Sequence, residues 1–270
     1  MECNKKDEKS GEEAGIMLRE VRNVATILEL EARRLRHDYS DIVIRSVQPI
    51  LWLVVFGSVF TNYRVIPTGE YSYLEFVAPG VLGQSVLFVS IFFGLMLVWD
   101  RESGNLSKLL VSPASRYSIV FGKSLSAGIR SIAQGAVVIL LILLVGIRFR
   151  TNPFLVLMVF PAIVLIAAVS ASISIFFTSL LKTRERVMGI GQVLTMPLFF
   201  TSNALYPVSI MPWWLQWIAY ANPLTYGINI LRSLMLTGDL SGIPLDIAVL
   251  TGYLLVLTLV NGRLLQRIME

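Results

Sequence analysis

Runs of about twenty consecutive apolar residues recur along this 270-residue sequence and restrict its fold more than any other feature. The run from Phe76 to Val98 reads FVAPGVLGQSVLFVSIFFGLMLV and contains no charged side chain. A helix of this length crosses a hydrocarbon core of about 30 Å and satisfies its own backbone hydrogen bonds there. The apolar/polar alternation typical of a membrane β-barrel is missing. The sequence therefore predicts an all-α membrane protein.

Composition supports this prediction and excludes other classes. Apolar residues make up 55% of the chain and charged residues 15%, whereas soluble domains carry about a quarter charged residues. The net charge of +5 does not indicate nucleic-acid binding, because the basic residues are spread over short segments between the apolar runs. Cys3 and His37 are the only cysteine and histidine, so we expect no metal site and no disulfide framework.

The chain divides into three predicted parts. Residues 1–15 are charged and poor in apolar side chains, which predicts a disordered tail. Residues 16–41 predict an amphipathic helix at the membrane interface, because one stripe is apolar and the opposite face is rich in arginine. That stripe consists of Met17, Val21, Val24, Leu28 and Leu35. The alternative is an ordinary surface helix. Residues 42–270 form the membrane domain, with six predicted spans: Ile42–Phe60, Phe76–Val98, Tyr117–Ile147, Phe154–Leu181, Val187–Leu205 and Leu245–Leu265.

The distribution of lysine and arginine predicts the orientation of these spans. With the N-terminus in the cytoplasm, the cytoplasmic segments hold eighteen basic residues and the outer segments hold four, namely Arg64, Arg148, Arg150 and Arg232. Basic residues accumulate on the cytoplasmic side of membrane proteins. We therefore expect a multi-pass protein of the cytoplasmic (inner) membrane with both termini inside.

The segment between the fifth and sixth spans is apolar but interrupted by prolines. It predicts two short helices, about 212–220 and 223–236, hinged at Asn222-Pro223, because proline is tolerated only in a first helical turn. A re-entrant pair at the outer mouth of a pathway and a plain aromatic belt both fit this pattern. The residues concerned are Pro212, Trp213, Trp214, Trp217, Asn222 and Pro223.

The sequence shows no catalytic constellation and no energy source of its own. Gly122-Lys123-Ser124 resembles the end of a phosphate-binding loop, but the required glycine five residues earlier is replaced by Tyr117 in an apolar helical context. No carboxylate lies deep within a predicted span, and Asp246 lies only at the edge of one, which argues against ion-coupled transport.

Arg130 is the one basic residue well inside a predicted span. Three environments fit it: snorkelling to the headgroups, polar neighbours such as Gln84 or Gln134, and a water-filled cavity between two copies of the chain. We take Arg130, Gln84, Gln134 and Asn203 as the candidate substrate pathway.

The loop after the second span, WDRESGNLSKLLVSPASRYSIVFGKSL, opens with three charges and continues into a short amphipathic stretch that ends at Ser112-Pro113. Such a helix, lying parallel to the membrane, predicts a docking surface for a cytoplasmic partner; the alternative is a plain linker.

From EFVAPGVLGQ to this loop, and again at MPWWLQWIAYANPLTYGINILR, the sequence resembles the type-2 ABC exporter permease family. Its daunorubicin-resistance and lipo-oligosaccharide exporter branches are the most similar. The resemblance implies a non-enzymatic half-transporter that pairs with a second permease, forming a homodimer, and with two cytoplasmic ATPase subunits. ATP and Mg²⁺ would be bound by those subunits, not by this chain. The resemblance also implies ATPase-contacting residues: Glu102, Gly104, Leu106, Leu109, Leu110 and Pro113.

We therefore expect the permease subunit of an ATP-driven exporter of a drug, lipid or glycolipid. The alternatives are a standalone secondary transporter and a membrane enzyme of lipid metabolism.

Overall fold

The computed structural model describes residues 20–33, 45, 47–49, 51–56, 71–104, 115–181 and 183–267. Those residues form helices and turns, and no strand occurs among them, as predicted for an all-α protein. The predicted tail (1–15) lies outside the described residues, as does much of the predicted first span. The described part of that span is helical and ends in the π-helix η1 (Trp52–Phe56).

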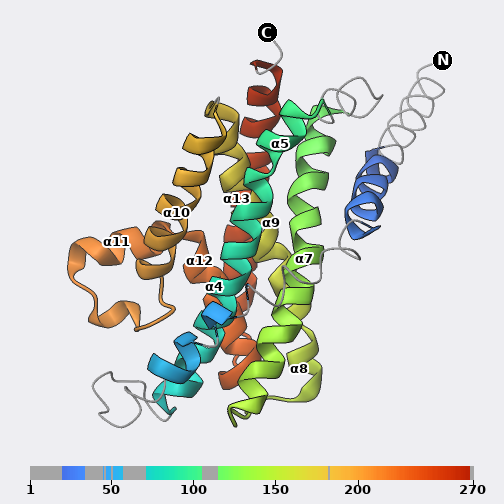
Figure 1. Ribbon diagram of the computed structural model, residues 1–270. Helices are drawn as coiled ribbons and strands as arrows, with labels where there is room; N and C mark the ends of the chain where they lie inside the picture. The colour runs from blue at the N-terminus through green and yellow to red at the C-terminus, as the bar shows by residue number, and fades with distance from the viewer. Residues whose placement is uncertain are drawn as a thin grey trace, which may run out of the picture.

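Within the described part of the chain, four helical stretches are long and apolar enough to cross a membrane. They are α4 (Tyr73–Leu95) with α5 (Leu97–Glu102), α7 (Arg116–Leu144), α8 (Pro153–Leu157) with α9 (Val159–Leu180), and α13 (Ile243–Arg267). They confirm helices at the predicted second, third, fourth and sixth spans. Figure 1 shows them running side by side. We call the end with α5 and the start of α7 the α5 end, and the opposite end the α8 end.

The predicted fifth span differs from the observed helix. Helix α10 (Arg184–Phe200) begins three residues earlier than predicted, with Arg184, Glu185 and Arg186 in its first turn, and ends five residues earlier. Its 17 residues extend about 25 Å. Pro197 lies inside the helix, which continues to Phe200, and turns and bends follow in residues 201–206. Because α10 is not among the four candidate spans, the six-span count stays a prediction.

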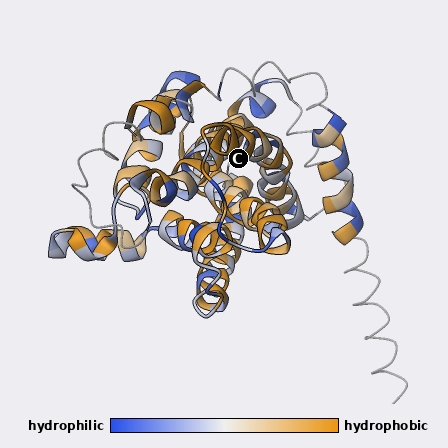
Figure 2. Cartoon of the chain, turned by 90° about the horizontal axis from the view of Figure 1, so that it is seen from below, coloured by the Kyte–Doolittle hydropathy of each residue, from blue (hydrophilic) through white to orange (hydrophobic). Residues whose placement is uncertain are grey.

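Helix α4 lies at the centre of the bundle, in contact with α7, α9 and α12 (Pro223–Arg232). In its most apolar window 83% of the residues are buried, against 22% for α13. Both α4 and α13 are apolar on all sides, but for different reasons. Helix α4 is surrounded by other helices, whereas the exposed apolar side chains of α13 are compatible with contact with lipid. Figure 2, viewed along the bundle, shows apolar residues on outer as well as inner faces.

Small and polar residues join the central helices to one another. The hydroxyls of Ser90 and Ser131 lie 2.9 Å apart between α4 and α7, and Ser172 of α9 donates to Ser124 of α7 over 2.8 Å. Asn261 of α13 donates to the Ser172 carbonyl at 2.9 Å. Such contacts are the usual adhesive between membrane helices, where water provides no hydrophobic driving force.

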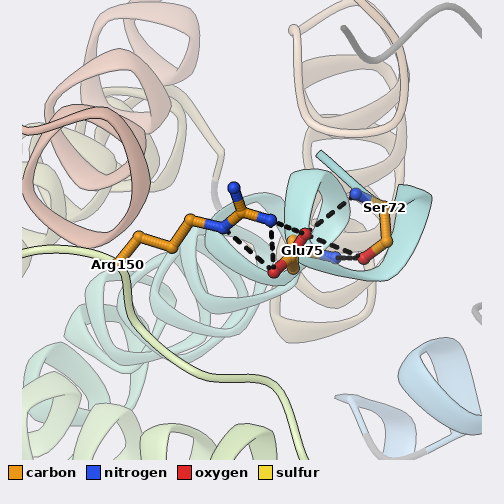
Figure 3. Close-up of polar contacts among 3 residues, drawn as sticks. All are labelled: Ser72, Glu75 and Arg150. Carbon is orange, nitrogen blue, oxygen red and sulfur yellow. Dashed lines mark hydrogen bonds and ion pairs between the residues drawn. The ribbon is translucent and has the colours of Figure 1, made fainter. Parts of the chain in front are cut away.

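At the α8 end, a charged clamp fixes the start of α4 (Figure 3). Ser72 and Glu75 form a capping box: the Ser72 N–H donates to the Glu75 carboxylate at 2.8 Å, and the Glu75 N–H donates to the Ser72 hydroxyl at 3.2 Å. Arg150, from the loop after α7, donates to the same carboxylate at 3.3 Å. The clamp therefore ties the start of α4 to the loop between α7 and α8.

The predicted pair of short helices is present as α11 (Trp213–Ala221) and α12. Asn222 ends α11 and caps α12, where its side chain accepts from the Leu224 N–H at 3.0 Å. Helix α12 stops earlier than predicted, because residues Ser233–Thr237 form the π-helix η3 and Gly238 follows at a φ of 68°. Figure 1 shows α11 projecting sideways from the bundle. Trp213, Trp214 and Trp217 are exposed on it.

Residues 20–33 form a helix beside α7, oblique to the long helices (Figures 1 and 2). The predicted apolar stripe coincides only in part with the face that this helix buries: Val24 and Leu28 are half-buried, but Val21 is 60% exposed. The two buried side chains are Ile27 and Glu31, and the stripe left out Glu31 because it is an acid. The interfacial placement predicted for residues 16–41 stays a prediction.

Candidate functional site

A cavity of about 340 Å³ lies at the α5 end of the bundle. Its walls come from the helix of residues 20–33, from Arg45, from α4, α5 and α7, and from single residues of α9 and α10. The lining combines aromatic with charged side chains: Phe92, Phe93, Trp99, Glu31, Arg45, Asp100, Lys123 and Arg130. This mixture suits an amphipathic guest, because apolar surfaces and charges face the same space.

Lys123 lies between two carboxylates in the cavity wall. Its Nζ donates to Glu31 Oε1 at 2.9 Å and to Asp100 Oδ2 at 2.5 Å. The three side chains are 10%, 3% and 15% exposed, respectively. The group joins residues that are 92 and 23 positions apart in the sequence, from the helix of residues 20–33, α7 and α5.

The charged triplet Asp100-Arg101-Glu102 at the end of α5 contacts three different elements. Asp100 pairs with Lys123 of α7, and Arg101 donates to the Leu181 carbonyl at the end of α9 at 3.3 Å. Glu102 pairs with Arg184, the first residue of α10. This triplet leads into the loop predicted to dock a cytoplasmic partner, which we call the partner loop. The base of that loop therefore contacts three helices.

Arg45 and Arg130 present their guanidinium groups to aromatic rings in the cavity wall. Arg45 lies 5.7 Å from the Phe92 ring centre, and Arg130 lies 5.3 Å from that of Phe93. The cavity that Arg130 lines is also lined by two carboxylates, Glu31 and Asp100. Sequence reasoning left Arg130 without an acidic neighbour, because Glu31 and Asp100 lie far from it in the sequence.

Three of the four predicted pathway residues lie near one another. Gln84 and Gln134 line a small neighbouring cavity of about 10 Å³, which also contacts Arg45 and Gln48. Arg45 lines both cavities, so a polar strip continues from Arg130 toward the two glutamines. The Gln84 side-chain oxygen is buried and makes no hydrogen bond with the described residues. A space of this size holds about one water molecule.

Asn203 lies in a different polar group, between the end of α10 and α12. Its side-chain amide donates to Oδ1 of the Asn229 side chain at 2.5 Å, and its backbone carbonyl accepts from Arg232 at 2.8 Å. The Arg232 guanidinium lies 4.0 Å from the Phe76 ring centre, packed against α4. The sequence placed Arg232 in an outer segment, and its charge gave no signal of this packing.

Of the predicted ATPase-contacting residues, the structure describes two. Glu102 lies in the last turn of α5, and Gly104 follows it at a φ of 72°, which favours glycine. Leu106, Leu109, Leu110 and Pro113 lie outside the described residues. Glu31, Arg45, Asp100 and Lys123 were not predicted as site residues. A lysine two turns into an apolar helix is the signal that the sequence offers for this group.

Among the described residues, no group of three or more His, Cys, Asp or Glu side chains is arranged to hold a metal ion. The Gly122-Lys123-Ser124 string lies inside α7 and not in a loop after a strand.

Comparisons with known proteins all point to the same family. Residues 22–236 match the family model "ABC-2 type transporter". The chain is 37% identical over 191 residues to "Putative transport permease ycf38" of Cyanophora paradoxa, covering 70% of this chain and 65% of that protein. It is 30% identical over 212 residues to "Probable doxorubicin resistance ABC transporter permease protein DrrC" of Mycobacterium tuberculosis, covering 76% and 74%. It is 29% identical over 198 residues to "Daunorubicin resistance ABC transporter permease protein DrrB1" of Streptomyces coeruleorubidus, covering 72% and 67%. The chain thus spans slightly less than two thirds of the Cyanophora relative.

Proposed function

Because this chain belongs to the ABC-2 type transporter family, we propose that it is the transmembrane permease subunit of an ATP-driven exporter. In this proposal a separate cytoplasmic ATPase binds ATP and Mg²⁺ and supplies the energy, and this chain catalyses no reaction. The assembly contains two permeases, as a homodimer, and two ATPase subunits in the cytoplasmic membrane.

The observation that carries the proposal is the fastening of α5. The triplet Asp100-Arg101-Glu102 contacts α7, the end of α9 and the start of α10 immediately before the loop predicted to dock a partner. A passive linker needs no such attachment. A loop that receives force from a motor subunit does, because the displacement has to reach several spans.

The lining of the cavity favours an amphipathic cargo. Aromatic rings offer apolar contact, and Arg45 and Arg130 present positive charge to the same space. Two relatives bear names that refer to daunorubicin and doxorubicin resistance. We propose that this chain moves a drug, lipid or glycolipid from the cytoplasm or the inner leaflet outward.

The proposal is tested with the complex reconstituted in inverted membrane vesicles. We expect an ATPase subunit to co-purify with the permease, and doxorubicin, used as a probe, to accumulate in the vesicles with ATP but not with a non-hydrolysable analogue. Uptake that ignores ATP and collapses with a protonophore would instead identify a secondary transporter. Absence of any co-purifying ATPase would contradict the proposal.

Arg130 is expected to contact the cargo within the cavity. Arg130→Gln removes a charge from the wall, and the loss of one charge-assisted contact predicts roughly tenfold weaker apparent affinity for an anionic or phosphate-bearing cargo. Arg130→Lys should restore part of the affinity. The concentration dependence of ATP-driven uptake of a phosphate-bearing lipid probe measures this affinity, with exposed Arg148→Gln as the matched control. Unchanged affinity in Arg130→Gln would assign Arg130 a structural role. Reduced expression with unchanged uptake per expressed molecule would do the same.

A further inference from the structure

Lys123 occupies a position where three parts of the transporter meet. The helix of residues 20–33 contributes Glu31, the base of the partner loop contributes Asp100, and both carboxylates bind the one ammonium of α7. The junction lies in the wall of the cavity.

The helix of residues 20–33 contacts α7 at two further points. Ile27 packs on Gly122, where a β-carbon would lie 3.4 Å from the Ile27 Cβ, so the helix approaches α7 closely. Ser115, which caps the start of α7, donates to the Glu20 carboxylate at 3.2 Å. Hydrogen bonds from Ser118 and Ser115 hold the pKa of Glu20 below its ordinary value, although burial opposes them. The contacts therefore extend over three turns of the helix.

Burial makes this junction stiff. The side chains of Glu31 and Lys123 are 3% and 10% exposed, so pulling the helix away would leave charges unpaired in a largely apolar wall. Breaking a buried ion pair at one partner is strongly unfavourable for this reason. The junction is thus better suited to transmit force than to open and close.

We propose that Lys123 is a positioning residue that joins the helix of residues 20–33 and the base of the partner loop into one rigid body with α7. The inference rests on the proposed function, because it assigns the joint a role in passing ATPase motion to the cavity. Displacement of either the helix or the loop would then move α7, and with it Arg130, two turns further along the same helix.

The chain offers a covalent substitute for the ionic joint. The 3.4 Å separation at positions 27 and 122 is near the Cβ–Cβ distance of disulfides, about 3.5–4.5 Å. In a Cys3→Ser background, Ile27→Cys with Gly122→Cys should therefore crosslink under mild oxidation. Glu20→Cys with Ser115→Cys, joined by a flexible bis-thiol reagent because the 3.2 Å hydrogen bond there spans the longer Glu20 side chain, provides a second pair if Gly122→Cys impairs insertion.

The first measurement is the crosslinking rate at this pair, which requires no transport. Glu31→Gln and Lys123→Gln should each slow it about tenfold, because the helix leaves α7 more often. Glu29→Gln is the matched control, since Glu29 lies on the exposed face of the same helix, paired only locally with Arg33. Equal crosslinking rates in all three variants would contradict the proposal that the ion pairs of Lys123 hold this helix against α7.

The second measurement is ATP-driven doxorubicin uptake by the reconstituted complex. Glu31→Gln should lose uptake while the ATPase still co-purifies and hydrolyses ATP, and oxidation of the cysteine pair in that variant should restore uptake until a reductant is added. Any of three results would overturn the proposal. Uptake could be normal in Glu31→Gln, oxidation of the cysteine pair could fail to restore uptake in that variant, or the same disulfide could block uptake by the otherwise wild-type transporter. If the wild type itself shows no ATP-driven uptake, the proposed function fails, and the crosslinking rate still decides the joint.

Discussion

Gly94 illustrates how a single residue sets the spacing of the central helices. A β-carbon at this position would lie 2.7 Å from the Ala171 carbonyl oxygen and would overlap Ser174, so only glycine allows α4 and α9 to approach this closely. The obstructing oxygen belongs to the backbone of α9 and cannot rotate away. The two helices would have to separate to accept even one methyl group.

Gly94→Ala is therefore expected to destabilise the bundle by about 1–3 kcal/mol through overpacking. Gly252→Ala is the matched control: no neighbouring atom lies within 4 Å of its added carbon, and alanine favours a helix over glycine by about 1 kcal/mol. Thermal aggregation of the detergent-solubilised protein, followed by size-exclusion chromatography, measures both variants. A Gly94→Ala protein as stable as the Gly252→Ala protein would contradict this packing.

At the scale of elements, the sequence predicted the long helices well and their surroundings poorly. The predicted spans at 117–147 and 154–181 lie within three residues of the observed helices, because the length of an apolar run fixes a membrane helix. Apolar character alone does not distinguish buried α4 from exposed α13, since lipid and protein interior accept the same side chains. The cavity could not be predicted from the sequence for a related reason. The pairing of Glu31 with Lys123 depends on how the helix of residues 20–33 packs against α7, and hydrophobic periodicity carries no information on that packing.

The junction of α5 with α10 should matter for coupling and little for stability. Glu102 and Arg184 are 37% and 51% exposed, and ion pairs of this kind contribute about 0–1 kcal/mol. Glu102→Ala should therefore leave thermal stability nearly unchanged but reduce ATP-driven uptake, and Leu109→Asp in the adjoining loop should weaken ATPase co-purification. Glu185→Ala, one residue beyond Arg184 and exposed, serves as the control. Normal uptake and co-purification in both test variants would contradict a docking role for the loop.

At the scale of the whole molecule, the structure divides the polar segments between two ends. Thr151 donates to the Leu234 carbonyl at 2.6 Å, and a β-carbon on Gly238 would lie 3.7 Å from Thr151, so residues 151 and 238 share the α8 end with the Glu75–Arg150 clamp. Thr183 precedes α10 beside Arg101 and Glu102 at the α5 end. The charge distribution predicts that the α5 end faces the cytoplasm, because eighteen basic residues lie in the predicted inner segments and four in the outer ones.

This division makes the topology testable with an impermeant thiol reagent on intact cells. In a Cys3→Ser background, single cysteines at Thr151 and Gly238 should react from outside together, because they are neighbours in the fold. Cysteines at Thr183 and Ser107 should react only after the membrane is permeabilised, and one at Asn62 should react from outside if the first span crosses as predicted. Opposite labelling of positions 151 and 238 would contradict the fold itself. Reversal of all five sites would keep the fold but place the α5 end, and with it the predicted ATPase-docking loop, outside the cell, where no ATP-driven partner could reach it.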